Sequence, residues 1–339
     1  MDAGTTMRFL TAYFSVTRQQ KILTGTPRMK ERPVSLLVDA LRTLGVQMDY
    51  QEKEGFPPIA IRGFDSQKTA SLEIAGNVSS QYISALMMVA PTLPQGLELR
   101  LTGIVASVPY IQMTVELMKT FGISVEFQGN RIRIDAQDYR PATLTIEADW
   151  SAASYWYGFT ALADEASIQL PHVTQKSWQG DVAIVEIMKM LGVDTRFEKN
   201  GAHLTKQSHH SHLDWDFTHC PDLAQTVLPV CAVKGINGSF TGLESLRIKE
   251  TDRIAALQNE LAKVGCHLTE DQKGRWLLSP GNIPKKPITI QTYHDHRMAM
   301  GFAPWACLAE LTIEQPQVVD KSYPGFWEDM KTVGFEFIG

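Results

Sequence analysis

The feature that most constrains the fold of this chain is a motif that recurs five times: an amphipathic helix, a glycine and a short strand. Glycine suits the left-handed position at which many helices end. Successive glycines of the motif are 77, 70, 73 and 69 residues apart. Such a regular period predicts a repeated structural unit. The helices and their glycines are 36–44 with Gly45, 115–121 with Gly122, 185–191 with Gly192, 257–264 with Gly265, and 326–333 with Gly334.

A further helix is expected about 40 residues before each of these glycines. Short strand-like runs separate the helices, and strands such as 45–50 and 122–127 follow the glycines. The repeat is therefore predicted to read strand–helix–strand–helix–strand–strand, a mixed α/β (α+β) unit. The five earlier helices are expected at 4–13, 80–89, 152–162, 222–233 and 295–309.

The repeats also predict two domains, with the boundary near 144–149, where Pro141 and acidic residues interrupt the pattern. Residues 1–146 then hold two units and residues 147–339 hold three. The first unit begins at its helix. A symmetric protein would have three units in each domain, so we expect an incomplete first domain that lacks an upstream unit of about 70 residues. A naturally asymmetric protein is the alternative.

Composition excludes several classes of function. The 339 residues are 44% hydrophobic and carry a formal net charge of −5. No basic stripe or nucleic-acid-binding motif is present, so a nucleic-acid partner is not expected. No apolar run reaches membrane-spanning length. Four scattered cysteines without CxxC spacing are typical of buried thiols, which predicts a cytoplasmic protein.

Cations crowd the start of the helix at 257–264, where acids are usual. Arg247, Lys249 and Arg253 precede or open it, and Glu250 lies among them. Backbone N–H groups and side-chain cations directed at one place bind anions well. Glu250 would be a carboxylate in a positive field, and therefore a candidate acid–base group.

The same pattern recurs at three other helix starts: 27–33, 295–300 and 321–325. In the first, Pro33 fits the first helical position. A single basic turn is commonly no more than a solvated surface. Four such helix starts in one chain predict a substrate with several negative charges.

Five motifs together resemble the 3-phosphoshikimate 1-carboxyvinyltransferase (EPSP synthase) family: PRMKERP (27–33), VSSQ (78–81), PDLAQT (221–226), RIKETDR (247–253) and DHRMAM (295–300). The resemblance runs from residue 2 to the end of the chain. It implies six βαβαββ units in two domains of the inside-out α/β barrel type, with central helices and outer sheets. Here the first domain would be incomplete.

The resemblance also implies the reaction. The family transfers the enolpyruvyl group of phosphoenolpyruvate to the 5-hydroxyl of shikimate 3-phosphate and releases phosphate. Both substrates are polyanions, and neither a metal nor another cofactor is needed. An acid must protonate the methylene carbon, and a base must take the hydroxyl proton. A monomer without nucleic-acid or membrane partners is expected.

By resemblance, Glu250 would handle the proton at the methylene carbon and Asp222 the proton at the 5-hydroxyl, with Lys321 beside them. Asp222 could instead be a helix N-cap, a common role for aspartate. Phosphoenolpyruvate would meet its own set of residues: Gly4, Arg32, Gln81, Arg253, His296, Arg297 and Lys321.

Shikimate 3-phosphate would meet a second set: Ser79, Ser80, Gln81, Ser107, Tyr110, Asp222, Ser245 and Lys249. Paired serines at a helix start can bind phosphate, although simple capping is the alternative. Three departures from the family matter here. The family's N-terminal Lys-Ser pair and the Arg that follows it have no match, Asp2 stands where the family usually has Asn, and Ser245 stands where Asn is common.

Two other functions stay open from the sequence. The sister transferase that acts on UDP-N-acetylglucosamine typically has a cysteine in the loop that corresponds to 24–33, and this chain has none there. A non-catalytic remnant of the enzyme is the other alternative. The histidines near 209–219 match no standard metal spacing, so no metal site is expected.

Overall fold

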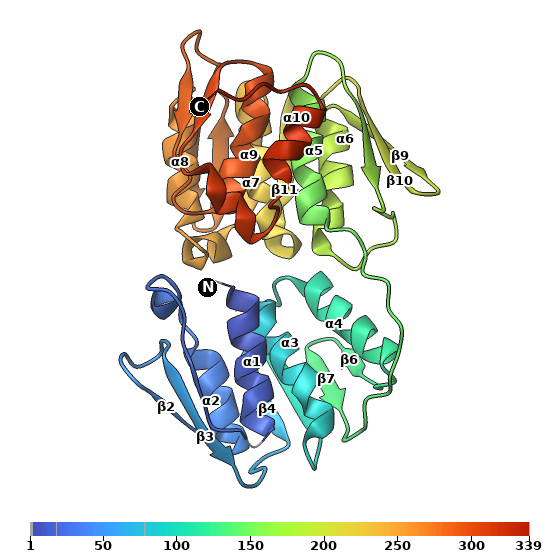
Figure 1. Cartoon of the computed structure of the whole chain (residues 1–339), viewed down its shortest axis with the longest axis vertical. Helices are drawn as coiled ribbons and strands as arrows, with labels where there is room; N and C mark the ends of the chain where they lie inside the picture. The colour runs from blue at the N-terminus through green and yellow to red at the C-terminus, as the bar shows by residue number, and fades with distance from the viewer. Residues whose placement is uncertain (1–2, 18, 78, 339) are drawn as a thin grey trace. The chain divides into compact units, whose positions relative to one another are not determined.

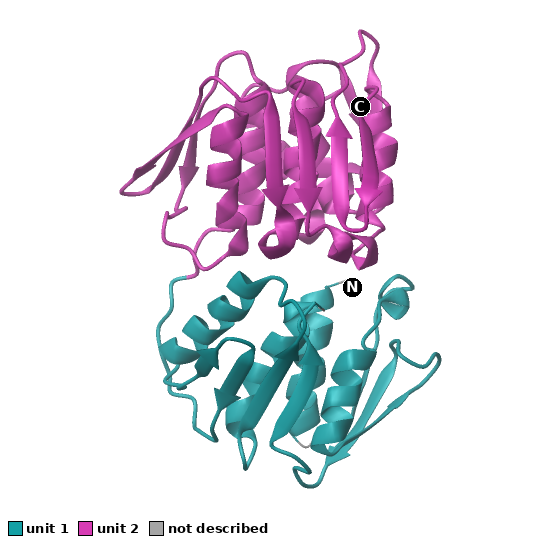
Figure 2. Ribbon diagram, turned by 180° about the vertical axis from the view of Figure 1, so that it is seen from behind, with its two compact units in different colours: residues 1–145 teal, residues 146–339 magenta. Residues whose placement is uncertain are grey.

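The computed structural model describes residues 3–17, 19–77 and 79–338 of the chain. Asp2 and the first residue of the VSSQ motif, Val78, lie outside this part. The chain divides into two compact units, Met1–Thr145 (unit 1) and Ile146–Gly339 (unit 2) (Figure 2). Each unit has a separate cluster of buried apolar side chains. No helix in the described residues is long and apolar enough to cross a membrane.

Unit 1 alternates helices and strands as the repeat predicts (Figure 1). Its elements are α1 (Gly4–Val16), β1 (Lys21–Leu23), α2 (Ser35–Leu44), β2 (Val46–Tyr50), β3 (Ile59–Phe64), β4 (Ser71–Ala75), α3 (Ser80–Val89), β5 (Leu97–Thr102), α4 (Val108–Thr120), β6 (Glu126–Gln128) and β7 (Arg131–Ile134). Two 3-10 turns, η1 (Met29–Glu31) and η2 (Ala90–Thr92), complete it.

Unit 2 contains longer connections with several 3-10 turns. Its helices are α5 (Trp150–Leu162), α6 (Ile184–Leu191), α7 (Ala224–Val233), α8 (Arg253–Ala262), α9 (His296–Phe302) and α10 (Phe326–Thr332). Its strands are β8 (Ser167–Pro171), β9 (Val193–Glu198), β10 (Gly201–Lys206), β11 (His212–Asp216), β12 (Asn237–Thr241), β13 (His267–Gln272), β14 (Arg275–Ser279), β15 (Ile288–Ile290) and β16 (Leu311–Ile313). The turns are η3 (Gly180–Ala183), η4 (Phe217–His219), η5 (Pro221–Leu223), η6 (Glu244–Ile248), η7 (Ala303–Cys307) and η8 (Pro316–Lys321).

Two repeats are complete and have the same topology. The sheet β4-β5-β7-β6 belongs to unit 1, and the sheet β11-β12-β14-β13 belongs to unit 2. In both sheets the first two strands pair in parallel and the remaining pairs are antiparallel. The expected βαβαββ unit and the mixed α/β fold class are confirmed by these sheets.

The earlier helix of each repeat packs at the centre of its unit. In unit 2, α5, α7 and α9 pack against one another, and nearly all their residues are buried. In unit 1, α1 packs against α3. The later helices α2 and α6 bury only one face, as amphipathic helices do. Within unit 2 the amino ends of α5, α7 and α9 come together, and this arrangement builds the charged site described below.

All five glycines of the motif have positive φ angles: Gly45 112°, Gly122 82°, Gly192 101°, Gly265 74° and Gly334 98°. Gly45 and Gly192 are the C-cap residues of α2 and α6, as predicted. The helices α4, α8 and α10 end two or three residues before their glycines, so their predicted endings were slightly wrong. Positive φ is strained for residues with a Cβ, which explains glycine at these positions.

Several predicted boundaries were wrong. The helix α2 begins at Ser35, so Pro33 lies two residues before it instead of opening it. The strand expected at 122–127 is limited to β6, Glu126–Gln128. The helix α4 starts seven residues earlier than the predicted 115, at Val108. The helix expected at 295–309 ends at Phe302 and continues as η7, where Pro304 has no N–H for the helical ladder.

The third repeat lacks its expected leading strand. Residues 141–147 form no strand, and the side chains of Leu144 and Ile146 are 38% and 81% exposed. The segment lies where the two units are joined, and no backbone hydrogen bond of a sheet is recorded for it. Residues 333–338, after α10, also carry no strand.

Candidate active site

A charged centre forms in unit 2 where the amino ends of α7, α8 and α9 meet. We use this name for Asp222, Glu250, Arg253, Asp295 and Arg297, together with Lys249 and Lys321. Arg253 lies in the middle, and only 2% of its side chain is exposed. Its guanidinium group donates to Asp222 at 2.8 Å, to Glu250 at 3.0 Å and to Asp295 at 2.6 Å.

Helix capping explains how the sequence places these groups. Asp252 is the N-cap of α8 and accepts a hydrogen bond from Ala255 N, so that Arg253 begins the helix. Asp295 is the N-cap of α9 and accepts from Arg297 N at 2.9 Å. The same Asp295 carboxylate binds the guanidinium of Arg253 through both oxygens. One buried acid thus starts α9 and fixes the arginine of α8.

The charges of the centre shift the pKa values of its members. Burial alone would raise the pKa of Asp222, but the positive charges of Arg297, Lys249 and Arg253 outweigh it and hold the pKa well below its ordinary value. Burial alone would lower the pKa of Arg253, but the carboxylates of Asp295, Asp222 and Glu250 raise it above its ordinary value. Asp222 is therefore ionised at neutral pH.

Glu250 lies between two cations. One oxygen accepts from Arg253 Nη2 at 3.0 Å and the other from Lys321 Nζ at 3.0 Å. Lys249 pairs with Asp222, and the distance between its Nζ and Asp222 Oδ1 is 3.3 Å. Asp222 and Glu250 therefore lie on either side of Arg253, each with its own lysine.

Arg297 closes the centre on the side of α5. Its Nη2 lies 3.3 Å from Asp222 Oδ2 and donates to Ser151 Oγ at 3.1 Å, while Nη1 donates to Tyr155 Oη at 3.4 Å. Its neighbour His296 is buried, and burial together with the charge of Arg297 lowers the pKa of the imidazole to about 4. His296 is therefore neutral at neutral pH.

The N-cap alternative for Asp222 was wrong. Asp222 lies inside η5, and the N-cap of α7 is Leu223, which has no side-chain capping bond. The carboxylate is directed to the cations instead. Ser245, the remaining predicted residue of unit 2, lies in η6 and is partly exposed.

Not every cation of the basic helix starts faces inward. Arg247 pairs with Asp252 and Glu270 and lies over the ring of Trp276, away from the charged centre. In unit 1, Arg28 pairs with Glu31 and Lys30 with Glu52, both at the exposed surface. These three residues behave as a solvated basic surface, because each has an acidic neighbour there.

Unit 1 assembles a second cationic group at the start of α1. Arg8 and Arg32 are both buried, and their guanidinium groups converge on Gly4. A Cβ added to Gly4 would lie 2.4 Å from Arg8 Nη1 and 2.9 Å from Arg32 Nη2. We call Arg8 and Arg32 the arginine pair. Like charges held this close to a helix start favour an anion.

Sequence reasoning missed Arg8, which lies one turn into α1 from Gly4. Its guanidinium lies 5.1 Å above the ring of Tyr82, and Nε and Nη1 have no hydrogen-bond partner in the part of the chain that the structure describes. An arginine on the apolar face of a helix was the available signal, because a buried charge needs a partner or a ligand.

The other predicted residues of unit 1 lie at the starts of α3 and α4. Gln81 donates to Thr5 Oγ1 at 2.8 Å, which ties α3 to the start of α1. Ser79 is the N-cap of α3 and accepts weakly from Gln81 N at 3.4 Å, and Ser80 is the first helical residue. The capping role weighed for these serines is therefore present at Ser79. Ser107 and Tyr110 lie at the N-cap and in the first turn of α4.

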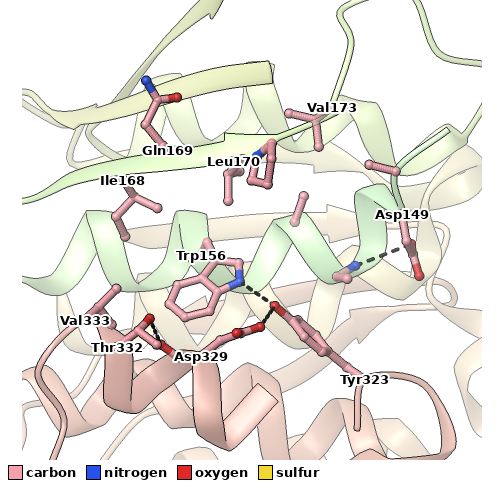
Figure 3. A pocket seen from close by; sticks show the side chains of 14 residues that line it. Asp149, Trp156, Ile168, Gln169, Leu170, Val173, Tyr323, Asp329, Thr332 and Val333 are labelled. Atoms are coloured by element: carbon pink, nitrogen blue, oxygen red, sulfur yellow. Dashed lines mark hydrogen bonds between the residues drawn. The ribbon is translucent and has the colours of Figure 1, made fainter. Parts of the chain in front are cut away.

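A separate cavity of about 350 Å³ lies beside α5, β8 and α10 in unit 2 (Figure 3). Ile168, Leu170 and Trp156 supply much of its apolar lining. The hydroxyl of Tyr323 accepts from Trp156 Nε1 at 3.2 Å and donates to Asp329 at 2.7 Å. The charged residues that line this cavity are carboxylates, so the charged centre, and not this cavity, suits polyanions.

No group of three or more His, Cys, Asp or Glu side chains is placed to hold a metal ion within residues 3–17, 19–77 and 79–338. His209 bonds the carbonyl oxygen of its neighbour His210, and His212 pairs with Asp214. The charged centre itself is made of carboxylates, ammonium groups and guanidinium groups.

Residues 1–330 match the family model described as EPSP synthase (3-phosphoshikimate 1-carboxyvinyltransferase). A curated protein of that name from Bacteroides fragilis is 47% identical over 99% of this chain and 82% of its own length. One from Salmonella typhimurium is 34% identical over 97% of this chain and 77% of its own length.

Solved structures share the fold. An EPSP synthase from Acinetobacter baumannii superposes with a TM-score of 0.76 at 20% identity, covering 98% of this chain and 78% of that one. The enolpyruvyl transferase NikO from Streptomyces tendae gives a TM-score of 0.70 at 15% identity, covering 96% of this chain and 76% of its own. At these identities the likeness concerns the fold.

Proposed function

This chain belongs to the EPSP synthase (3-phosphoshikimate 1-carboxyvinyltransferase) family, and on that premise we propose a role in the family's reaction for the residues that each unit assembles. The enzyme transfers the enolpyruvyl group from phosphoenolpyruvate to the 5-hydroxyl of shikimate 3-phosphate, giving 5-enolpyruvylshikimate 3-phosphate and phosphate. The observation that carries the assignment of roles is the charged centre, where two carboxylates of different surroundings flank one buried arginine.

In its protonated form Glu250 delivers its proton to the methylene carbon of phosphoenolpyruvate, and it thereby becomes the carboxylate whose oxygens Arg253 and Lys321 contact. Lys321 assists this step. Protonation of that carbon makes C2 electrophilic, so that the hydroxyl oxygen can add to it. Support comes from the contacts of Glu250: Arg253 and Lys321 hold its two oxygens at 3.0 Å each, which fixes the carboxyl group in one orientation. The ammonium of Lys321 also stabilises the negative charge left on Glu250 after proton transfer.

Asp222 takes the proton of the 5-hydroxyl. It is ionised at neutral pH, as a base must be, but the cations that lower its pKa also make it a weak base. Anionic substrates bring negative charge to the same cations. This charge offsets the effect of Arg297 and Lys249 on Asp222, so that substrate binding raises the pKa of the carboxylate toward the value that proton transfer needs.

Phosphoenolpyruvate carries a carboxylate and a phosphate, and two groups of cations are available for them. Arg297 and Arg253 bind the carboxylate, with neutral His296 beside it. The phosphate meets Lys321, Arg32 and the backbone at Gly4, and the buried guanidinium of Arg8 joins this set. Gln81 lies next to the start of α1 and contacts both substrates.

Shikimate 3-phosphate is bound by hydroxyl groups at helix starts. Ser79, Ser80 and Ser107 bind its phosphate, where N–H groups of α3 and α4 also point outward. Tyr110 lies beside the phosphate. In unit 2, Lys249, Asp222 and Ser245 contact the hydroxyls of the ring.

Phosphate release tests the reaction. The protein is incubated with both substrates and with each substrate omitted in turn, and inorganic phosphate is measured over time. We expect release only when both substrates are present. Release from phosphoenolpyruvate alone would contradict a transferase, and no release from an otherwise folded protein would favour the non-catalytic alternative. UDP-N-acetylglucosamine in place of shikimate 3-phosphate distinguishes the sister transferase, and we expect no release with it.

A further inference from the structure

Arg297 is oriented by groups that the reaction itself does not require. Besides Asp222, its guanidinium contacts two hydroxyl groups of α5, Ser151 and Tyr155. An arginine that binds a carboxylate in two-point geometry must present its N–H groups at a fixed angle. The residues behind the guanidinium therefore decide how well it meets a ligand.

The hydroxyl group of Ser151 takes part in two hydrogen bonds, one as acceptor and one as donor. Its Oγ accepts from Arg297 Nη2 at 3.1 Å and donates through a short hydrogen bond to Asp181 Oδ2. A hydroxyl group has one hydrogen, so donation to Asp181 leaves only lone pairs to face Arg297. Asp181 is a fully buried carboxylate on η3, thirty residues further along the chain.

Gln179 fixes η3 against the start of α5. Its side-chain oxygen accepts from Trp150 N at 2.8 Å, and its amide donates to the carbonyl of Ala148 at 2.8 Å. Gln179 lies two residues before Asp181, and Trp150 is next to Ser151. These two bonds of Gln179 keep Ser151 and Asp181 next to each other, so that the hydroxyl can donate to the carboxylate.

We propose that Asp181 is a positioning residue for enolpyruvyl transfer: through Ser151 it holds the guanidinium of Arg297 in the orientation that binds the phosphoenolpyruvate carboxylate. The inference rests on the binding role proposed above for Arg297. A buried carboxylate is costly to desolvate and persists where it has a strong partner or a task. Asp181 acts on Arg297 by fixing the hydroxyl of Ser151, which accepts the hydrogen bond from Arg297.

Steady-state kinetics of single and double variants tests the proposal, with the KM of each substrate measured at saturation of the other. Ser151→Ala removes the relay, and we expect a rise of roughly tenfold or more in the KM for phosphoenolpyruvate, with the KM for shikimate 3-phosphate within twofold of the parent. Ser151→Thr keeps the hydroxyl and should restore most of the loss. Asp181→Asn should raise the same KM.

The double variant with Asp181→Asn and Ser151→Ala distinguishes a relay from two separate effects. If Asp181 acts through Ser151, the double variant should have nearly the KM for phosphoenolpyruvate of Ser151→Ala alone. If Asp181→Asn does not fold, Ser151→Ala and Ser151→Thr still test whether the hydroxyl of Ser151 positions Arg297.

Ser154→Ala is the matched control. Ser154 lies one turn further along α5, is fully buried, and bonds the carbonyl of Ser151 and the hydroxyl of Thr226, but it has no recorded bond to Arg297. Its removal should lower the melting temperature and leave both KM values unchanged. A purely structural role for Ser151 predicts the same result for Ser151→Ala, and that result would overturn the proposal.

Arg297→Ala separates this inference from the function on which it rests. We expect Arg297→Ala to raise the KM for phosphoenolpyruvate by more than Ser151→Ala does. If Arg297→Ala leaves that KM unchanged, both the binding role of Arg297 and the positioning role of Asp181 are wrong. If Arg297→Ala raises it while Ser151→Ala stays within twofold of the parent, only the positioning role falls.

Discussion

At the scale of single residues, the charged centre balances opposite charges in a small buried volume. Arg253 alone binds three carboxylates, and one of them, Asp295, is fully buried. Removal of one member of such a group leaves another charge unpaired, which costs several kcal/mol in typical cases, about 3–5. For each substitution in the charged centre, folding must therefore be measured as well as activity.

Asp222→Asn should abolish most turnover and preserve ligand binding. The amide keeps the shape of the side chain but cannot take the proton of the hydroxyl, so we expect kcat to fall by roughly 10²–10⁴-fold. Calorimetry should still detect binding of shikimate 3-phosphate. As a control, Asp216→Asn alters the carboxylate that caps η4, outside the charged centre, and should leave kcat unchanged. Normal turnover in Asp222→Asn would reject Asp222 as the base.

His296 should make the protein sensitive to acid. The pKa of this buried imidazole is lowered from 6.5 to about 4, chiefly by burial and by Arg297 and Arg253, which outweigh Asp295 and Glu250. The unfolded chain therefore binds a proton below pH 6.5 that the folded chain does not bind until about pH 4. Stability is full above pH 6.5 and falls as the pH drops through this window, by an amount on the order of 3 kcal/mol.

The test compares unfolding by urea between pH 7 and pH 4 for His296→Asn and His294→Asn. His296→Asn should flatten the decline of stability in this window, because the titrating group is gone. His294 is exposed and lies two residues earlier, so its substitution should leave the decline as in the parent. Equal pH profiles for the parent and His296→Asn would show that another group is responsible.

At the scale of elements, the amino ends of helices carry most residues of the charged centre. The central helices of unit 2 are almost entirely buried, so polar groups gather at their ends, where free backbone N–H groups and acidic caps occur. In unit 2 these ends supply Asp222, Arg297 and Ser151. The carboxyl ends of the later helices have a different task, since their glycines turn the chain into the outer strands.

Gly45→Ala should destabilise unit 1 more than Gly129→Ala. Both glycines have positive φ, 112° and 57°, which costs about 1–2 kcal/mol for alanine. A Cβ on Gly45 would also lie 2.4 Å from the carbonyl oxygen of Ser66, whereas a Cβ on Gly129 meets nothing within 4 Å. We expect a loss of about 3 kcal/mol for Gly45→Ala. Urea unfolding of both variants measures the difference, and equal losses would contradict the steric argument.

At the scale of the whole molecule, two compact units with separate cores are joined by an exposed segment. Residues 141–146 are all exposed and form no helix or strand. A segment with few contacts is where a native protein is most easily cut.

Brief digestion with thermolysin should therefore cut first before Leu144 or Ile146, which are the apolar residues that this protease prefers and which are exposed here. Mass spectrometry of the fragments identifies the cut, and circular dichroism of the separated fragments reports whether each stays folded. A first cut inside either unit would show that the segment is better protected than its exposure indicates. Replacing both residues with Asp should delay the cleavage.

The sequence by itself determined the repeat, the glycines that follow its later helices, and the family. A glycine at positive φ is required by steric contacts within a few residues, so Gly45 or Gly192 can be recognised without knowledge of the fold. Helical spacing is also a local property. Each of the ten helices predicted from it overlaps an observed helix of the described residues. The predicted ends erred where capping and strand pairing decide, as at α2 and β6.

Only the tertiary structure decided which charges face the site. Sequence spacing treats Arg247 and Arg253, or Arg28 and Arg32, as members of the same basic turn. Packing buries Arg253 and Arg32 and leaves the other two beside surface acids. Whether a charge turns inward depends on partners far along the chain, such as Asp295 for Arg253, and local sequence does not reveal them. The link from Asp181 through Ser151 to Arg297 joins three distant segments for the same reason.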